Sequence, residues 1–281
     1  MDEARFEACL AELNADRSRG ASALARRCLE WCGESARTAP AETVAELAAL
    51  LDRRAEALAG ARPTMIAIAN LVQTWRRAAG DRAAADLAPA RTAAAAAAAR
   101  LARRSQDAAR AAAAQAAARI GDGKTVLTHS LSSTVLETFA VLARGHVRAI
   151  VTESRPLYEG CAVAAELGRR GIATTSIVDA AAAAVMPEVD AVLVGADAVL
   201  PDGAIVNKVG TRLIALAAAE RGVPFIVVCE SFKRWPPDRP SPTAFEEKEA
   251  AEVWAPVAGV RVRNPYFEAT PARLITALVT E

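Results

Sequence analysis

The sequence contains few aromatic residues, almost no net charge and only two histidines. Phe, Trp and Tyr together account for 4% of its 281 residues, although 53% of the residues are hydrophobic. Because much of this apolar content is alanine, we expect closely packed helices rather than a core built from large rings. The net charge of +1 at pH 7 provides no general electrostatic attraction for nucleic acid or for a membrane surface, and we expect neither as a partner.

Long apolar runs are also missing. No stretch of about 20 strongly apolar residues is present, so the sequence predicts no membrane-spanning helix. The first residues, MDEARFEACLAEL, are acidic and amphipathic, unlike a secretory signal. We therefore expect a cytoplasmic protein.

The five cysteines are expected to be free thiols in that compartment. Cys28 and Cys32 stand four residues apart on a predicted helix and share a face, which is one way to build a metal site. No further group of cysteines or histidines accompanies them. Buried core thiols are therefore the better interpretation, and no metal is expected.

Residues 1–120 show the three-to-four spacing of apolar residues that is typical of amphipathic helices. This pattern predicts helices at Ala21–Trp31, Glu42–Leu58 and Ala67–Trp75. Seven consecutive alanines follow at 93–99, in a segment with one polar face. Because alanine has the highest helix propensity, we expect a long helix ending at Gly121 rather than disorder. Residues 1–120 are therefore assigned to a helical N-terminal domain, whose last helix links it to the remainder.

From Lys124 the pattern changes to strands that alternate with helices of about ten residues. The predicted strands are Thr125–Thr128, Val147–Val151, Ala173–Val178, Ala191–Val194 and Phe225–Cys229, and the predicted helices include Ser133–Arg144, Cys161–Arg170 and Thr211–Arg221. The alternation predicts an α/β fold with a doubly wound parallel sheet over residues 121–281. A final helix is expected to begin near Pro271. No G-x-G-x-x-G motif follows the first strand, so we expect neither a dinucleotide nor any other cofactor.

The predicted strands end in polar residues, and parallel α/β sheets bind ligands at the carboxyl ends of their strands. Asp197 follows the fourth strand after a break at Gly195, and a turn at Pro201–Gly203 leads on to Asn207, Lys208 and a helix start. An acid, an amide, an ammonium and a free helix N-terminus together suit a phosphorylated, polyhydroxylated small molecule.

Two cations at these strand ends are candidates for anion contacts. Arg155 precedes Pro156 in an extended turn just after the second strand, and Lys208 stands shortly before Gly210 at the helix start. Both positions suit a phosphate. The alternative for each is an ordinary surface charge.

The other polar residues at the strand ends have structural explanations. Ser130, Ser132 and Asp179 fit helix caps. His129 is better explained as a core histidine, hydrogen-bonded to a backbone carbonyl, than as a catalytic residue.

Several segments of the chain resemble the translation initiation factor 2B α/β/δ-related family. They are VGADAVLPDGAIVNKVGTRLIALAAAERGVPFIVV, ESFK, TESRPLYEG and NPYFEATPARLITALVTE, with SRGAS (Ser18–Ser22) and RPTMIAIAN (Arg62–Asn70) nearer the N-terminus. That family includes ribose-1,5-bisphosphate isomerase and methylthioribose-1-phosphate isomerase. The resemblance covers most of the chain and is most specific from Thr125 onward.

The resemblance implies a helical N-terminal domain on a Rossmann-like C-terminal domain, with a sugar-phosphate site between them. It also implies homodimers or larger homo-oligomers formed through the C-terminal domain. Asp197 matches the catalytic acid/base of the isomerases. The phosphorylated ligand, a sugar phosphate or a nucleotide, would be held by Arg19, Gly20, Ala21, Arg155, Asn207 and Lys208.

One position departs from the isomerases, which carry a catalytic cysteine where this sequence has Ser130, in LTHSLSS. A serine hydroxyl is a much weaker acid than a thiol, whose pKa is about 8.5. Ser130 therefore needs a strong partner to move a proton near neutral pH. Cys161 follows Gly160 at a predicted helix start, where a thiolate is stabilised. A buried place on the sheet-facing side of that helix is the simpler interpretation of Cys161.

Two functions follow from this pattern. The first is an aldose–ketose isomerase of a phosphorylated pentose, with Asp197 as acid/base and Ser130 hydrogen-bonded to the reacting oxygens. The second is a non-catalytic regulatory or ligand-sensing protein on the same scaffold. The regulatory initiation-factor subunits resemble the pattern but tend to lose both the cysteine and the acid, whereas this chain keeps the acid. Nucleotide exchange is a third option that would require partner subunits.

Overall fold

The computed structural model describes residues 1–79, 86–242 and 244–281. The chain forms two compact units, Met1–Asp107 and Ala108–Glu281. The division falls within helix α5 (Leu87–Ile120), and the domain limits 1–120 and 121–281 stay a prediction. The α/β fold class with a helical N-terminal region and a parallel sheet is confirmed.

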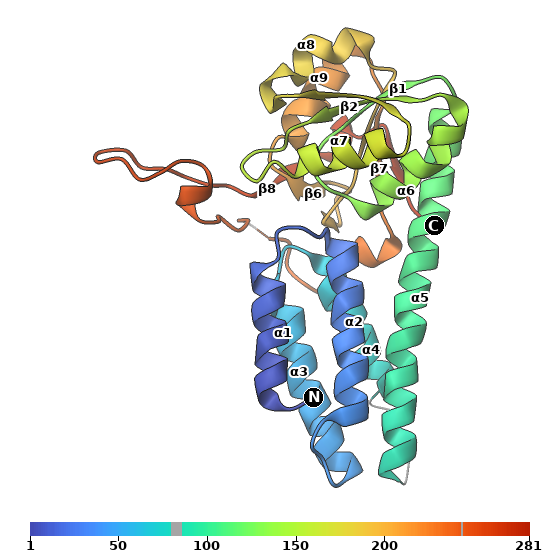
Figure 1. Cartoon of the computed structure of the whole chain (residues 1–281), viewed down its shortest axis with the longest axis vertical. Helices are drawn as coiled ribbons and strands as arrows, with labels where there is room; N and C mark the ends of the chain where they lie inside the picture. Colours follow the sequence, from blue (N-terminus) through green and yellow to red (C-terminus); the bar gives the residue numbers. More distant parts are fainter. Residues whose placement is uncertain (80–85, 243) are drawn as a thin grey trace. The chain divides into compact units, whose positions relative to one another are not determined.

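The first unit consists of helices. They are α1 (Glu3–Ala15), α2 (Ala21–Thr38), α3 (Val44–Ala61), α4 (Ile66–Ala79) and the first part of α5 (Figure 1). The predicted helices are confirmed, and each ends later than predicted, while α3 begins at Val44 and not at Glu42. α3 begins with a capping box, because Thr43 accepts a hydrogen bond from the backbone of Glu46 while the Glu46 carboxylate bonds back to the Thr43 backbone.

Small residues bring α2 and the alanine-rich α5 close together. A Cβ added to Gly33 would lie 3.5 Å from the Cβ of Ala98. The indole of Trp75 on α4 donates a 2.9 Å hydrogen bond to the carbonyl of Ala94. The alanine run thus provides a narrow packing surface, and α5 ends at Ile120 as predicted, with Gly121 in the left-handed region at φ 82°.

Core thiols are found where the cysteine spacing predicted them. Cys28 and Cys32 are buried on α2, and burial raises the pKa of Cys28 to about 12. Cys9 on α1 is buried as well. Among the residues that the structure describes, no group of three His, Cys, Asp or Glu side chains is arranged to hold a metal ion.

The second unit is built around a six-stranded parallel sheet with the order β3-β2-β1-β4-β7-β9. The strands are β1 (Thr125–Thr128), β2 (Arg148–Thr152), β3 (Ala173–Ile177), β4 (Ala191–Val194), β7 (Phe225–Val228) and β9 (Ala277–Val279). The order runs outward in one direction from β1 and in the other from β4. Ligand sites of doubly wound sheets lie at this reversal, beyond the carboxyl ends of the two strands.

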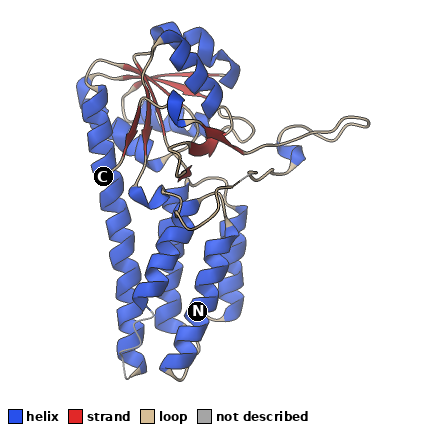
Figure 2. Ribbon diagram, turned by 180° about the vertical axis from the view of Figure 1, so that it is seen from behind, coloured by secondary structure: helices blue, strands red, loops and turns tan. Residues whose placement is uncertain are grey.

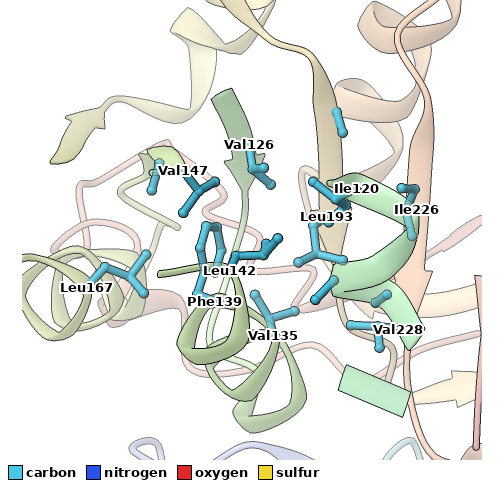
Figure 3. Packing of buried hydrophobic residues seen from close by; sticks show 14 of the residues in the cluster. Ile120, Val126, Val135, Phe139, Leu142, Val147, Leu167, Leu193, Ile226 and Val228 are labelled. Carbon is cyan, nitrogen blue, oxygen red and sulfur yellow. The ribbon is translucent and has the colours of Figure 1, made fainter. Parts of the chain in front are cut away.

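Helices cover both faces of this sheet (Figure 2). Successive strand residues point to opposite faces, so Val126 packs with α6 (Ser133–Leu142) and α7 (Glu159–Arg169), while Leu127 packs with α9 (Thr211–Arg221). Figure 3 shows the first cluster, in which Phe139 of α6 is fully buried. Because both faces of the sheet are buried, the sequences of the central strands are continuous runs of apolar residues.

Two parts of the second unit differ from the sequence prediction. A small antiparallel sheet of β5 (Ala198–Val199), β6 (Ile205–Lys208) and β8 (Phe267–Thr270) was not predicted. The helix expected from Pro271 is wrong, because a short 3-10 turn is followed by β9 beside β7. The hydroxyl of Thr276 accepts a hydrogen bond from the Phe225 backbone and fixes this pairing.

None of the helices in the described ranges is long and apolar enough to cross a lipid bilayer.

Candidate functional site

The candidate site is built by the segments that follow β1, β2 and β4, together with β6 of the small sheet. β1 and β4 are neighbours at the reversal of strand order. Their following loops touch, since a Cβ added to Gly195 after β4 would lie 2.6 Å from the hydroxyl of Ser132 after β1. Ser130 and Asp197 therefore belong to adjoining loops.

Ser130 adopts a left-handed backbone conformation, with φ 64°. Its backbone N–H donates to Ser154 Oγ at 2.8 Å, and its own hydroxyl donates to Glu159 Oε1 at 2.8 Å. A left-handed serine costs of order 1–3 kcal/mol and persists only where its surroundings fix it. Ser130 is thus not the helix cap that the sequence suggested. Ser132 is, because it accepts a hydrogen bond from the Val135 backbone at the start of α6.

Glu159, in the first turn of α7, forms an ion pair with Lys208 of β6. Lys208 Nζ lies 2.7 Å from Glu159 Oε1, and the two side chains are 4% and 10% exposed. The ammonium also lies 3.3 Å from the ring centroid of Tyr266. Glu159 Oε2 is buried and has no hydrogen-bond partner among the described residues. Oε1 of Glu159 therefore connects the Lys208 ammonium to the Ser130 hydroxyl, while Oε2 makes no hydrogen bond to the described residues.

Burial lowers the pKa of Lys208, and nearby carboxylates oppose this effect. Glu159 opposes it most, followed by Asp197 and Glu252. Asp197 is half-buried at the end of β4, and its backbone N–H donates to the Val206 carbonyl at 2.8 Å. Asp197 and Glu159 thus both act electrostatically on Lys208.

Asn207 and Lys208 are strand residues of β6, and their neighbours stabilise the start of α9. The Asn207 amide donates to Thr211 Oγ1 at 3.1 Å, and Thr211 in turn donates to the Lys208 carbonyl at 2.6 Å. The N–H groups of Gly210 and Arg212 donate to Glu268 Oε1, at 2.7 and 2.9 Å. The free helix N-terminus expected here is therefore wrong, because a carboxylate of β8 already binds it.

His129 is a core histidine, as predicted. Its Nε2 lies 2.9 Å from the Val209 carbonyl and its Nδ1 lies 2.6 Å from Thr152 Oγ1. A carbonyl can only accept, so Nε2 carries the proton and Nδ1 accepts from Thr152. Burial lowers the pKa of His129. The hydrogen bond to the Val209 carbonyl is the largest of the effects that raise this pKa.

Asp179, after β3, fixes the loop after β2 instead of capping a helix. Its two carboxylate oxygens accept 2.8 Å hydrogen bonds from the backbone N–H groups of Ser154 and Arg155. The prediction of a cap at Asp179 is therefore wrong. The carboxylate instead determines where Ser154 and Arg155 lie relative to Ser130.

The Arg155 guanidinium lies 5.0 Å above the ring of Tyr158 and donates to the Val253 carbonyl at 2.8 Å. A second nitrogen donates to the Tyr158 hydroxyl. The group is half-buried and carries its full charge. It is positioned by aromatic stacking and by uncharged acceptors, which leaves its charge available to an anion.

Arg19, Gly20 and Ala21 belong to the first unit. Arg19 Nη1 lies 3.1 Å from Glu12 Oε1 and 3.1 Å from Asp16 Oδ2, and its side chain is 42% exposed. Gly20 is the N-cap residue of α2, which places the N–H groups of this segment at a helix N-terminus. Ala21 is buried.

Cys161 is exposed on α7, so the expectation of a buried thiol is wrong. The preceding Gly160 is the residue that packs closely against the sheet, because a Cβ added there would lie 1.8 Å from the Thr152 carbonyl oxygen. Sequence reasoning also missed Glu159. The signal available for it was an acidic residue in the first turn of a helix that follows a strand, within TESRPLYEG.

Comparison with known proteins gives consistent results. The profile of the Initiation factor 2 subunit family matches residues 17–281. A ribose 1,5-bisphosphate isomerase of Archaeoglobus fulgidus is 36% identical over 237 residues, covering 81% of this chain and 73% of that protein. A putative translation initiation factor eIF-2B subunit 2-like protein of Pyrococcus abyssi is 35% identical over 278 residues, covering 97% and 93%.

Solved structures agree with both kinds of relative. A translation initiation factor eIF-2B of Pyrococcus horikoshii superposes with a TM-score of 0.84 at 31% identity, covering 98% of this chain and 94% of that one. The 5-methylthioribose 1-phosphate isomerase of the same organism superposes with a TM-score of 0.81 at 25% identity, covering 98% and 82%. An isomerase and an initiation factor thus share this fold.

Proposed function

Because the chain belongs to the Initiation factor 2 subunit family, we propose that it binds a phosphorylated pentose and interconverts its aldose and ketose forms. Relatives named ribose 1,5-bisphosphate isomerase support this proposal. So does the superposition on a 5-methylthioribose 1-phosphate isomerase. The substrate is a ribose phosphate of one of these two types.

The observation that carries the proposal is the buried ammonium of Lys208 among carboxylates at the reversal of strand order. Burial lowers the pKa of Lys208, while Glu159 and Asp197 hold its charge in place. A desolvated cation beside an acid is typical of sites that handle charge developing on a ligand. The adjacent Ser130 and Asn207 add hydroxyl and amide groups that suit sugar oxygens.

Asp197 is the acid/base of the proposed reaction. Aldose–ketose isomerisation moves hydrogen between neighbouring carbons, and a positioned acid/base contributes about 10²–10⁴-fold to such a rate. Asp197 is half-buried at the carboxyl end of β4 and interacts with Lys208. Ser130 hydrogen-bonds the reacting oxygens, and Asn207 orients a sugar hydroxyl.

Phosphate binding is assigned to Arg155, Lys208 and the segment Arg19–Ala21. Arg155 supplies a fixed guanidinium held by Tyr158 and Val253. In the first unit, phosphate binding is proposed for Arg19, which pairs with Glu12 and Asp16, and for the backbone N–H groups of Gly20 and Ala21 at the start of α2. We further propose a cytoplasmic homodimer or larger homo-oligomer, with no nucleic acid partner.

A non-catalytic sensor of a sugar phosphate or nucleotide is the alternative. Ser130 favours it, because a hydroxyl is a much weaker acid than the thiol that the isomerases carry there. The relative named as an eIF-2B subunit 2-like protein also favours it, since it aligns with 97% of this chain. Retention of Asp197 favours the enzyme.

Incubation of the purified protein with ribose 1,5-bisphosphate and with 5-methylthioribose 1-phosphate tests the proposal, with phosphorus NMR to follow the products. The enzyme converts one of them to the corresponding ribulose phosphate. In parallel, thermal unfolding is measured with each compound, since a ligand at 100 times its Kd adds about 2.7 kcal/mol of stability. Stabilisation without turnover would establish the sensor instead.

A further inference from the structure

Three groups of this site form a continuous hydrogen-bonded chain. The Ser130 hydroxyl donates to Glu159 Oε1 at 2.8 Å, and the same oxygen lies 2.7 Å from Lys208 Nζ. The residues come from the loop after β1, from α7 and from β6, so the fold and not local sequence brings them together. All three are at least nine-tenths buried at their side chains or as whole residues.

We propose that Ser130, Glu159 and Lys208 form a proton relay, in which the Glu159 carboxylate takes and returns the proton that Ser130 exchanges with the bound sugar phosphate. The relay rests on the proposed isomerase function. It makes Glu159 a residue that acts through Ser130, while Asp197 remains the proposed acid/base.

The orientation of the Ser130 hydroxyl supports this direction of transfer. Because a carboxylate only accepts, the hydroxyl hydrogen points at Glu159, which leaves the Ser130 oxygen lone pairs for a proton from the ligand. A serine alone is too weak an acid and too weak a base to move a proton near neutral pH, and an adjacent general base corrects this. Glu159 is that base.

The spare oxygen of Glu159 distinguishes a relay from a plain ion pair. A buried ion pair stabilises a fold only when additional hydrogen bonds satisfy its remaining lone pairs. Glu159 Oε2 is buried without a partner in the described part of the chain. A buried carboxylate oxygen left in this condition is costly as a purely structural element, so we assign it a part in the transfer.

The transfers balance in atoms and charge. In the forward step a ligand O–H or C–H bond breaks and a bond to Ser130 Oγ forms, while the original Ser130 O–H bond breaks and an O–H bond to Glu159 forms. The ligand becomes negative as Glu159 becomes neutral. Lys208 thereby loses its partner charge and stabilises the new charge on the ligand. The return step reverses both transfers and needs no oxidant or reductant.

Several charged groups surround this chain and enter any measurement of its protonation. Asp197 and Glu252 act on Lys208, and Asp179 and Glu159 act on His129, which also faces Lys208. The test therefore changes Glu159 alone and compares it with Glu166, a half-buried carboxylate of the same helix that pairs with Arg169 and Arg170.

The first measurement needs no substrate. Ser130→Cys places a thiol beside Glu159, and its titration is followed by thiolate absorbance, with the signal of the five native cysteines subtracted using the wild type. A neighbouring carboxylate disfavours a thiolate. Adding Glu159→Gln to Ser130→Cys should shift this titration to lower pH by about one unit or more. Adding Glu166→Gln should leave it unchanged. Identical curves for S130C and S130C/E159Q would overturn the relay.

The second measurement separates proton transfer from mere positioning. Glu159→Gln keeps an oxygen that accepts from Ser130, so a positioning role predicts a kcat within about threefold of wild type. The relay predicts a kcat loss of about 10²–10⁴-fold with little change in KM. Ser130→Cys in the E159Q background should recover at least about tenfold, because a thiol carries its own acidity. No loss in E159Q, or a loss without recovery, would contradict the relay.

The two measurements distinguish failure of the relay from failure of the proposed function. If the wild type turns over neither sugar phosphate while the thiol titration depends on Glu159, the isomerase is wrong and the coupled pair stands. If the titration is independent of Glu159, the relay is wrong whatever the turnover. Should S130C/E159Q fail to fold by circular dichroism, Glu159→Asp replaces E159Q. It keeps a carboxylate but draws it back from both position 130 and Lys208, which share the same oxygen of Glu159, and unchanged titration and kcat would then overturn the relay.

Discussion

Lys208 Nζ lies 2.7 Å from Glu159 Oε1, in an ion pair whose side chains are 4% and 10% exposed. The ring of Tyr266 lies against the same ammonium. Such a pair gains little net stability, because desolvation offsets most of its Coulomb attraction. Its presence at the carboxyl ends of the strands is therefore better explained by function than by folding.

Removing only one charge of this ion pair should lower the free energy of unfolding far more than removing both charges. Lys208→Met leaves the Glu159 carboxylate buried without its cation, and we expect a loss of about 3–5 kcal/mol in the free energy of unfolding. The double variant Lys208→Met/Glu159→Gln removes both charges and should recover most of that loss. Urea denaturation measures both.

The exposed pair Lys124–Asp190 is the matched control, because its side chains are 45% and 40% exposed. Lys124→Met should change the free energy of unfolding by no more than about 1 kcal/mol. Similar losses for Lys124→Met and Lys208→Met would show that the buried pair has no special role.

Two glycines of α7 should respond in opposite directions to alanine. A Cβ at Gly160 would lie 1.8 Å from the Thr152 carbonyl oxygen, so Gly160→Ala forces the backbone apart and displaces the neighbouring Glu159. We expect a loss of more than 1 kcal/mol, roughly the range of overpacked sites. At Gly168 nothing lies within 4 Å of the added Cβ, and Gly168→Ala should stabilise by about 0.5–1 kcal/mol. Thermal melts that rank the two variants the other way would be incompatible with this packing.

Arg155 should contribute to phosphate affinity through its fixed guanidinium. Arg155→Ala removes a charge held by Tyr158 and Val253, and we expect the Kd for a sugar phosphate to rise about 10-fold or more, as for the loss of a charge-assisted hydrogen bond. Arg169→Ala, whose side chain is 71% exposed on α7, should bind as the wild type does. Isothermal titration calorimetry compares the two, and equal affinities would remove Arg155 from the site.

Buried thiols should make the protein less stable in alkali. Burial raises the pKa of Cys28 and of Cys229 from 9.0 to about 12. Below pH 9 folded and unfolded chains both keep these protons; above it the unfolded chain releases them first, so stability falls as pH rises toward 12.

Each thiol should contribute up to about 1.4 kcal/mol per pH unit within that window. Cys28→Ala and Cys229→Ala should each flatten the decline, as measured by urea denaturation between pH 8 and 11, roughly the window of the shift. Cys161→Ala should not, because Cys161 is exposed. A decline of the same slope in all three variants would assign it to other groups.

Much of the second unit could be predicted from the sequence, because short local patterns mark where its central strands and helices begin and end. Ala191–Val194 and Thr211–Arg221 were predicted with the bounds that the structure has, since apolar runs and a glycine cap mark their ends. The polar residues after β1 and β4 could be placed together because parallel strands bring their carboxyl ends to one edge.

What the sequence did not predict depends on partners far along the chain. Glu159 is an ordinary acidic residue of a helix start until the fold brings Ser130 and Lys208 to it. The helix end at Gly210 looked free because Glu268, which binds it, lies on β8. The tail after Pro271 pairs as a strand because β7 offers it an edge.

Asp197 is the proposed acid/base of the isomerase, and the kcat of Asp197→Asn shows whether it has this role. The control is Asp202→Asn in the turn that follows, where Asp202 accepts a 3.0 Å hydrogen bond from the Ala204 backbone that asparagine can also accept. With the sugar phosphate that the wild type converts, we predict a kcat loss of about 10²–10⁴-fold in Asp197→Asn, and wild-type turnover in Asp202→Asn. An Asp197→Asn variant that isomerises as fast as Asp202→Asn would show that Asp197 is not the acid/base.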